Sequence, residues 1–119
     1  MSTLPISMVD PKQSADPLAY YQELFDTLGE AYWDASDIAS KDQIQGARDA
    51  TLKIITGITK QRLEANTAAM VTLQSLVERT SVALEEIQKS VNKIIRNIET
   101  AGKVEAAIAK VLSLAGKVF

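Results

Sequence analysis

Apolar residues recur at steps of three and four along most of this chain, the spacing that places side chains on one face of an α-helix. The most regular run spans residues 63–101. Its apolar positions form a set that we call the interaction stripe: Leu63, Met70, Leu73, Val77, Leu84, Ile87, Val91, Ile94 and Ile98. Gly46 and Gly57 each weaken a helix by about 1 kcal/mol without ending it, and no proline follows Pro17. The pattern predicts one long central amphipathic helix over residues 41–101.

A shorter helix is predicted before the central one. Asp16 followed by Pro17 is typical of a helix start, because Asp caps the first turn and proline lacks an N–H that would be unpaired there. This helix is expected over residues 17–37. Ser40, with Gln43 three residues on, predicts a capping box at the start of the central helix.

The two ends of the chain complete the expected organisation. Residues 1–15 are rich in proline and serine and predict a flexible N-terminal arm. Gly102 interrupts the apolar register, so we expect a hinge or a helix C-cap there, followed by a short helix over residues 103–118. The expected fold class is all-α, a single helical domain over residues 16–119 of the helical bundle or coiled-coil type.

The apolar stripe is too wide for a simple two-stranded zipper. The positions that flank it, which usually carry charges in a coiled coil, are Ala69, Leu76, Ala83 and Ile95. A helix over 41–101 would be about 90 Å long at ~1.5 Å per residue, and the flanking helices, of about 30 and 25 Å, are too short to cover it. We therefore expect a homo-oligomer, or another helical protein on the stripe. The alternative is a bend near Gly57 that folds the chain into a compact four-helix monomer.

Five carboxylates line one face of the first predicted helix: Glu23, Asp26, Glu30, Asp34 and Asp37. Residues 1–42 carry a net charge of −6 and residues 43–119 a net charge of +4, so the two parts attract each other within one molecule or between neighbours. The acidic face is interpreted as a solvated surface, with a basic protein partner and a divalent cation as alternatives. It lacks the Glu-x-x-His motif of di-iron bundles and a calcium loop, and we expect no metal.

The last predicted helix has two interpretations. Its apolar positions include Val104, Ile108 and Val111, and its lysines are Lys103, Lys110 and Lys117. Such a helix either packs over the bundle or lies on an anionic membrane surface.

A few polar and aromatic residues stand out from the apolar pattern. Asn66 and Thr80 are polar positions on the core face, where they either fix the helix register or are tolerated at an exposed seam. Five of the six aromatic residues lie on the first predicted helix, and four of them stand out as amphipathic rings: Tyr20, Tyr21, Tyr32 and Trp33. They either close the end of the bundle or anchor a partner.

The residue inventory excludes several classes of function. The chain contains no histidine and no cysteine, which removes the commonest general base, the thiol nucleophile and most transition-metal ligands. We expect no enzymatic activity, no cofactor and no small-molecule substrate. The net charge of −2 argues against nucleic acid as a partner.

No segment approaches the ~18 consecutive apolar residues of a transmembrane span, and the N-terminus lacks the pattern of a cleaved signal. We expect a cytoplasmic protein, or one exported without a cleaved signal peptide, and no transmembrane span. The leading hypothesis is a non-enzymatic protein-interaction or assembly module, such as a scaffold, an adaptor, a chaperone-like binder or a toxin-neutralising binder, that self-associates. The alternative is a secreted or translocated membrane-active protein that uses its lysine-bearing last helix.

Overall fold

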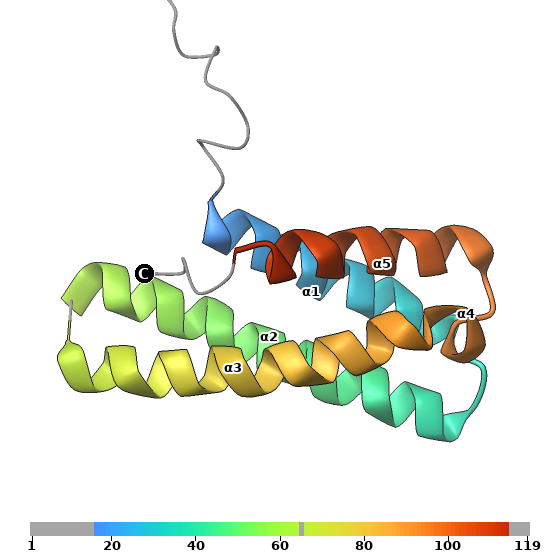
Figure 1. Ribbon diagram of the computed structural model, residues 1–119, viewed down its shortest axis with the longest axis horizontal. Coiled ribbons are helices and arrows are strands. Elements are labelled where there is room, and N and C mark those ends of the chain that lie inside the picture. The colour runs from blue at the N-terminus through green and yellow to red at the C-terminus, as the bar shows by residue number, and fades with distance from the viewer. Residues whose placement is uncertain (1–15, 65, 115–119) are drawn as a thin grey trace, which may run out of the picture.

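The computed structural model describes residues 16–64 and 66–114 of the chain. These residues form five helices (Figure 1): α1 (Pro17–Trp33), α2 (Ile38–Glu64), α3 (Thr67–Lys89), α4 (Val91–Ile94) and α5 (Ile98–Leu112). The all-α fold class is confirmed, with a long central helix, α2, between shorter elements at the two ends. The predicted N-terminal arm over residues 1–15 lies outside the described residues.

The prediction of one continuous helix over residues 41–101 is wrong. Helix α2 ends at Glu64, and α3 runs back beside it to form a hairpin that extends past the ends of α1 and α5 (Figure 1, left). Asn66 caps α3, because its side-chain oxygen accepts a hydrogen bond of 3.0 Å from the N–H of Ala69. The longest extent of the molecule is accordingly 50 Å. Folding back lets the apolar faces of α2 and α3 cover each other within one chain.

The chain therefore adopts a compact bundle, but it turns back between α2 and α3 and not near Gly57, where the sequence suggested a bend. Gly57 lies inside α2, where an added Cβ would come within 2.8 Å of Leu73 Cδ1 on α3. The glycine thus allows the two helices of the hairpin to approach closely.

A second interruption divides the other half of the predicted helix. Helix α3 ends at Lys89, and the single turn of α4 follows. Asn97 then caps α5, since its side-chain oxygen accepts hydrogen bonds from the N–H groups of Glu99 (2.9 Å) and Thr100 (3.1 Å). The hinge or C-cap expected at Gly102 is absent, because this glycine lies in the second turn of α5.

The start of α1 is confirmed, and the start of α2 is corrected. Asp16 caps α1 by accepting a hydrogen bond of 3.0 Å from the N–H of Leu18. Helix α1 ends at Trp33, earlier than the predicted residue 37. The residue that caps α2 is Asp37, whose carboxylate accepts a 2.7 Å hydrogen bond from the N–H of Ser40. Ser40, the predicted cap, is buried inside the first turn.

Two connections far apart in sequence are tied together at one end of the bundle. Ala35 and Ile95 form an isolated antiparallel bridge. Beside it, the N–H of Ser36 donates to the carbonyl of Ile94 (2.8 Å) and the N–H of Arg96 donates to the carbonyl of Asp34 (2.9 Å). This clasp joins the α1–α2 connection to the α4–α5 connection, so α1 lies between α2 and α5 (Figure 1, right).

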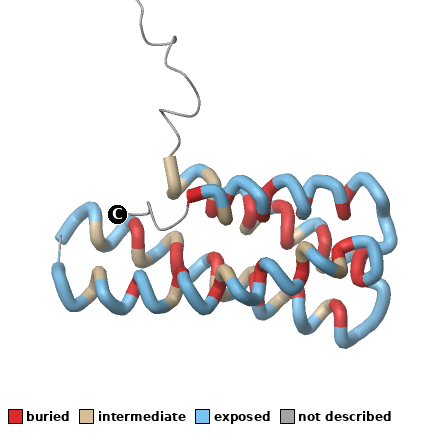
Figure 2. The backbone as a smooth tube through the Cα atoms, viewed as in Figure 1, coloured by how far each residue is buried: buried red, intermediate tan, exposed pale blue. Residues whose placement is uncertain are grey.

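The core is almost entirely aliphatic, as the low aromatic content requires. Buried positions face inward along every helix, and exposed positions cover the outside (Figure 2). The largest side chains that are nearly or fully buried are Tyr21, Leu24, Leu28, Ile44, Ile54, Ile58, Leu84, Ile87, Ile95 and Ile108. Tyr21 is the one aromatic residue among them, and burial raises the pKa of its phenol to about 12.

We predict that alanine at Gly46 or Gly102 stabilises the protein. Both glycines lie inside helices, and nothing within 4 Å would meet an added Cβ. Each replacement should raise the free energy of unfolding by about 0.5–1 kcal/mol, because glycine loses more backbone entropy than alanine in a helix. Urea denaturation measures this change. Gly57→Ala is the matched control. Its free energy of unfolding should stay the same or fall, because the added methyl group would collide with Leu73.

A second stability prediction concerns Thr80, which is 3% exposed on α3. Its hydroxyl oxygen has no hydrogen-bond partner among the described residues. Thr80→Val should raise the free energy of unfolding by about 1 kcal/mol, because a buried unsatisfied hydroxyl is unfavourable.

Thr51→Val is the control for Thr80. Thr51 is also buried, but its hydroxyl donates a 2.7 Å hydrogen bond to the carbonyl of Ala47. This variant should lower the free energy of unfolding by about 0.5–1 kcal/mol. Equal effects of the two variants in urea denaturation would contradict the interpretation.

Candidate functional site

Most of the predicted interaction stripe belongs to the protein's own core. Six of its members are buried: Leu73, Val77, Leu84, Ile87, Val91 and Ile94. Met70 is half-buried. Leu63 and Ile98 are exposed, at 82% and 83%, but lie at opposite ends of the bundle. The expectation of one long outward-facing stripe is therefore wrong, because the α2–α3 hairpin and α5 cover it within the same chain.

Helix α5 follows the packing interpretation. Val104, Ile108 and Val111 are at most 2% exposed, so its apolar face lies in the core. Lys103 and Lys110 reach back to α1. Lys117 lies outside the described residues. Within residues 16–64 and 66–114, no helix is long and apolar enough to cross a membrane.

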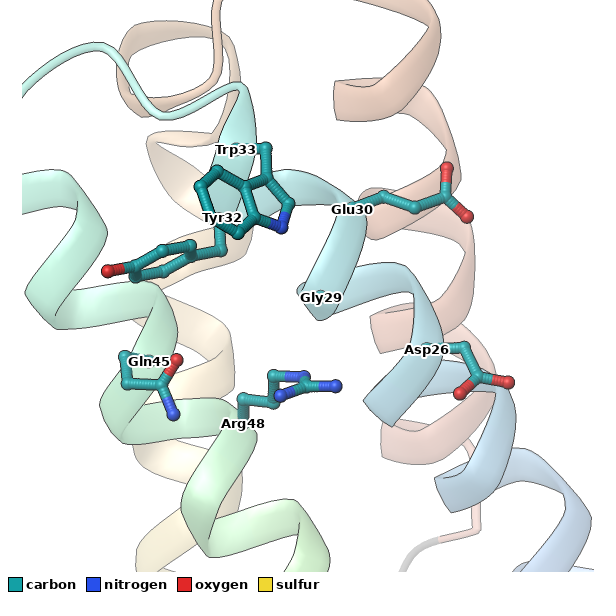
Figure 3. A pocket seen from close by; sticks show the side chains of 7 residues that line it. All are labelled: Asp26, Gly29, Glu30, Tyr32, Trp33, Gln45 and Arg48. Atoms are coloured by element: carbon teal, nitrogen blue, oxygen red, sulfur yellow. The ribbon is translucent and has the colours of Figure 1, made fainter.

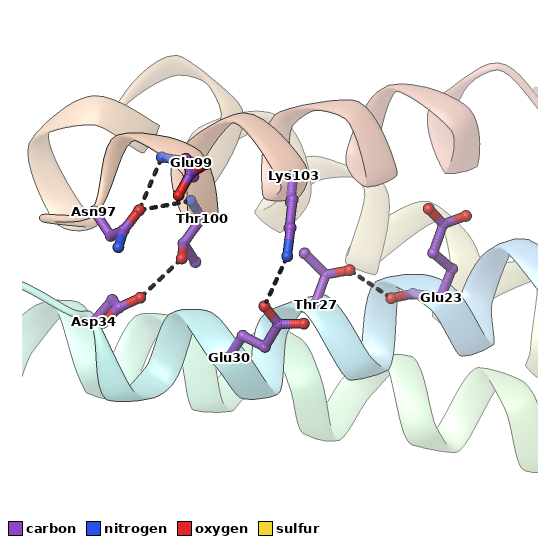
Figure 4. Close-up of polar contacts among 8 residues, drawn as sticks. All are labelled: Glu23, Thr27, Glu30, Asp34, Asn97, Glu99, Thr100 and Lys103. Atoms are coloured by element: carbon purple, nitrogen blue, oxygen red, sulfur yellow. Dashed lines mark hydrogen bonds and ion pairs between the residues drawn. The ribbon is translucent and has the colours of Figure 1, made fainter.

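The acidic residues of α1 meet the lysines of α5. The ammonium of Lys103 lies 3.4 Å from a carboxylate oxygen of Glu30 (Figure 4), and that of Lys110 lies 3.1 Å from Glu23. All four side chains are about half-exposed, so each pair adds little stability. Their arrangement shows that the opposite charges of the two halves of the chain meet within one molecule.

The other acidic residues have separate roles. Asp34 accepts a 2.8 Å hydrogen bond from the hydroxyl of Thr100 on α5, beside the clasp (Figure 4). Asp37 caps α2. Asp26 is exposed and forms no ion pair with a described residue. The described residues contain no group of three or more acidic side chains able to hold a metal ion.

The most distinctive surface feature is a groove between α1 and α2. Its main cavity, of about 550 Å³, is lined by Asp26, Gly29, Glu30, Tyr32, Trp33, Gln45 and Arg48 (Figure 3). A neighbouring cavity of about 390 Å³ shares Asp26 and is lined also by Gln22, Phe25, Leu52 and Ile55. The two cavities lie along α1 and α2 and share Asp26, and we call them together the α1–α2 groove.

Arg48 lies between the walls of this groove in a fixed position. Its guanidinium carbon is 3.9 Å from the centroid of the Phe25 ring, and its Nε–H donates a 3.3 Å hydrogen bond to the Phe25 carbonyl. A Cβ at Gly29 would lie 3.1 Å from Nε and from Nη2 of Arg48, so glycine leaves room for the guanidinium. Arg48 forms no ion pair with a described residue.

Aromatic rings form the end of the groove nearest the clasp. Trp33 is 74% exposed, and its ring meets that of Tyr32 edge to face with centroids 5.3 Å apart. The ammonium of Lys41 lies 5.3 Å from the Tyr32 ring centroid and 5.8 Å from that of Trp33. Cations over ring faces are attracted to the π-electrons and hold these rings in place.

A second, smaller groove of about 290 Å³ lies on the α2–α3 hairpin. It is lined by Lys53, Gly57, Lys60, Ala69, Thr72, Leu73 and Leu76. Its lining contains no aromatic residue, and neither of its lysines is held by a hydrogen bond and a ring contact as Arg48 is. The α1–α2 groove is therefore the stronger candidate site.

The sequence indicated part of this site but not its centre. Tyr32 and Trp33 were candidates as anchoring aromatics, and Asp26 and Glu30 belonged to the acidic face. Arg48 and Gly29 were missed, because their roles arise from a contact between two helices. The only local signal was the helical spacing of Gln45, Arg48, Leu52 and Ile55 along α2.

The chemistry of the α1–α2 groove suits recognition. Trp, Tyr and Arg are the residues that most often dominate binding energy at protein interfaces, and here they line one cavity. Comparison of the chain with family models, with curated proteins and with solved structures finds no match.

The cap of α2 predicts a dependence of stability on acid pH. Hydrogen bonds from the Ser40 side chain and from its N–H lower the pKa of Asp37 below its usual value of 3.8. A lowered folded-state pKa gives stability that is present above pH 3.8 and is lost as the pH falls through the folded-state value. Asp37→Asn should therefore show a smaller loss of stability in that interval than the wild type.

Urea denaturation at a series of pH values measures this difference. Asp37→Ser keeps a capping oxygen without a charge and should show the same reduced dependence. If both variants lost stability with falling pH as much as the wild type does, the assignment of this pH dependence to Asp37 would be contradicted.

Proposed function

We propose that this protein is a non-enzymatic helical interaction and assembly module that self-associates through its α1–α2 groove. The surface differs from the one the sequence suggested, since the stripe over residues 63–98 is largely core. A module of this kind acts as a scaffold, an adaptor, a chaperone-like binder or a toxin-neutralising binder through the shape and charge of one surface.

The observation that carries the proposal is the exposure of Trp33. A side chain of this size, 74% exposed, leaves a large apolar area in water, which burial would stabilise at about 25 cal/mol per Å². It stands beside Tyr32 and in the same cavity as Arg48. A cluster of these three residue types is typical of the centre of a protein interface.

The shape of the groove supports a helical partner. Residues Gln22, Phe25, Asp26, Gly29 and Trp33 of α1 recur at steps of one, three and four, and they form a wall along one side of the helix. Leu52, which is 47% exposed, and the half-buried Ile55 continue the other wall. An amphipathic helix laid between two such walls is a common form of recognition.

The absence of histidine and cysteine from the whole chain supports a non-enzymatic role. The membrane-active alternative gains no support from α5, whose apolar face packs in the core. It would require α5 to leave the bundle and give up Val104, Ile108 and Val111.

We predict that Leu52→Glu weakens self-association. The wild type should show a concentration-dependent mass above 12.9 kDa in light scattering and sedimentation equilibrium. A charge placed in the wall of the groove should weaken association about tenfold or more, which corresponds to ~1.4 kcal/mol.

Val82→Glu is the matched control. Val82 is 61% exposed but lies on α3, outside the groove, and its variant should associate like the wild type. A wild-type mass of a single chain at every concentration would refute self-association, and equal weakening by both variants would refute the choice of surface.

A further inference from the structure

The outer face of α5 is exposed along the whole helix and carries a single charge. Its positions recur at steps of four, three and four residues: Ile98, Gly102, Glu105 and Ala109. Ile98 is 83% exposed. Lys103 and Lys110 lie to one side of this face, where they pair with acids of α1. Glu105 forms no ion pair with a described residue, so its carboxylate is free for a partner.

The α1–α2 groove presents a cation that no described acid pairs with. The Nε–H of Arg48 donates to the Phe25 carbonyl, and the guanidinium packs against the Phe25 ring and Gly29. Its terminal Nη groups donate to no described residue. Arg48 is half-buried and lines the 550 Å³ cavity. A guanidinium held in this way gains strong hydrogen bonds from a carboxylate that a partner supplies, and little side-chain freedom is lost.

The apolar parts of the two surfaces lie at matching distances from these charges. On α2, Arg48 follows Lys41 by seven residues, and on α5 Glu105 follows Ile98 by seven residues. Each interval is about 10 Å in a helix. The Lys41 ammonium lies 5.8 Å from the Trp33 ring centroid. When α5 of a second copy runs parallel to α2 with its acid at Arg48, Ile98 therefore lies at the level of Trp33.

The sizes of the side chains also favour this register. One turn further along, the exposed Leu52 of the groove lies level with Ala109 of α5, and the small side chain leaves room for the leucine. Ile98 and Trp33, which are 83% and 74% exposed, cover each other, and burial of such apolar area stabilises the contact. The reverse direction of α5 would carry Ile98 away from Trp33 and leave both in water.

We propose that copies of this protein associate head to tail, with the outer face of α5 of one copy in the α1–α2 groove of the next and Glu105 paired with Arg48. This inference rests on the proposed function and names the surface that fills the groove. Helix α1 lies between α2 and α5 (Figure 1), so one copy can use both surfaces at once. Because the two surfaces differ, assembly continues beyond two copies unless it closes into a ring.

Charge reversal at Glu105 tests the pairing in the full chain. Sedimentation velocity is measured at a concentration where the wild type associates. Glu105→Lys brings a cation to Arg48 and should weaken association roughly tenfold or more. Glu105 is exposed, so the variant should keep its fold, which circular dichroism checks. The double variant R48E/E105K restores opposite charges and should associate again.

A mixture of two variants tests whether the interface is head to tail. Leu52→Glu blocks the groove and keeps the α5 face, whereas Glu105→Lys blocks the α5 face and keeps the groove. In an equimolar mixture, one intact face meets one intact groove, and the complex has no further pair of intact surfaces. Assembly should therefore stop at two chains. This mixture decides the question even if Arg48→Glu does not fold.

Glu78→Lys is the matched control. It makes the same change of charge on an exposed residue of α3, whose outer face is another helix surface that a groove could take. Because α3 is not the helix that we place in the groove, this variant should associate like the wild type.

Each outcome bears on the inference. Weakening by Glu105→Lys together with two-chain complexes in the mixture supports it. Association that Leu52→Glu weakens and Glu105→Lys leaves unchanged overturns the α5 face and leaves the groove standing. Single chains in the mixture overturn the head-to-tail arrangement, and equal weakening by Glu78→Lys overturns the choice of α5. A wild type that is a single chain at every concentration overturns both this inference and the self-association on which it rests.

Discussion

The architecture depends on the fold-back of α3 onto α2. The apolar face that continues through both helices is too large to be left in water, and the hairpin buries it within one chain. Gly57 permits the close approach, and Leu73 fills the space that a side chain there would take. Once this face is core, the surface that we propose for recognition lies on the other side of α2, where it meets α1.

The clasp between Ala35 and Ile95 places α1 for that role. Its backbone hydrogen bonds hold the end of α1 against the α4–α5 connection, and Asp34 adds a side-chain hydrogen bond to Thr100. Glu23 and Glu30 face the lysines of α5 on one side of α1. The opposite charges of the two halves of the chain thus meet between α1 and α5, and Asp26 stays exposed without an ion pair among the described residues.

The α1–α2 groove combines rigid and exposed parts. Arg48 is held by Phe25, and Tyr32 and Trp33 are held by each other and by Lys41. Side chains that are already ordered lose less entropy on binding than mobile ones. This property, rather than any reactive group, supports the proposal that the groove binds a partner.

The sequence by itself determined the elements that local chemistry controls. Helical periodicity predicted the all-α class, and Asp16 and Pro17 predicted the start of α1. The apolar spacing of Val104, Ile108 and Val111 predicted a C-terminal amphipathic helix but left open whether it packs on the bundle or on a membrane. Each of these follows from neighbours one or two turns apart.

The tertiary structure alone decided where the long helix breaks and which face stays exposed. The apolar run that begins at Leu63 continues across the α2–α3 turn, so the hydrophobic pattern alone does not show the break. The local signal was Asn66, which was interpreted as a core position rather than a helix cap. Arg48 and Gly29 acquired their roles only when α1 and α2 came together, because their contact spans two helices. Periodicity shows that a face is apolar, but the packing of the whole chain decides whether that face is covered.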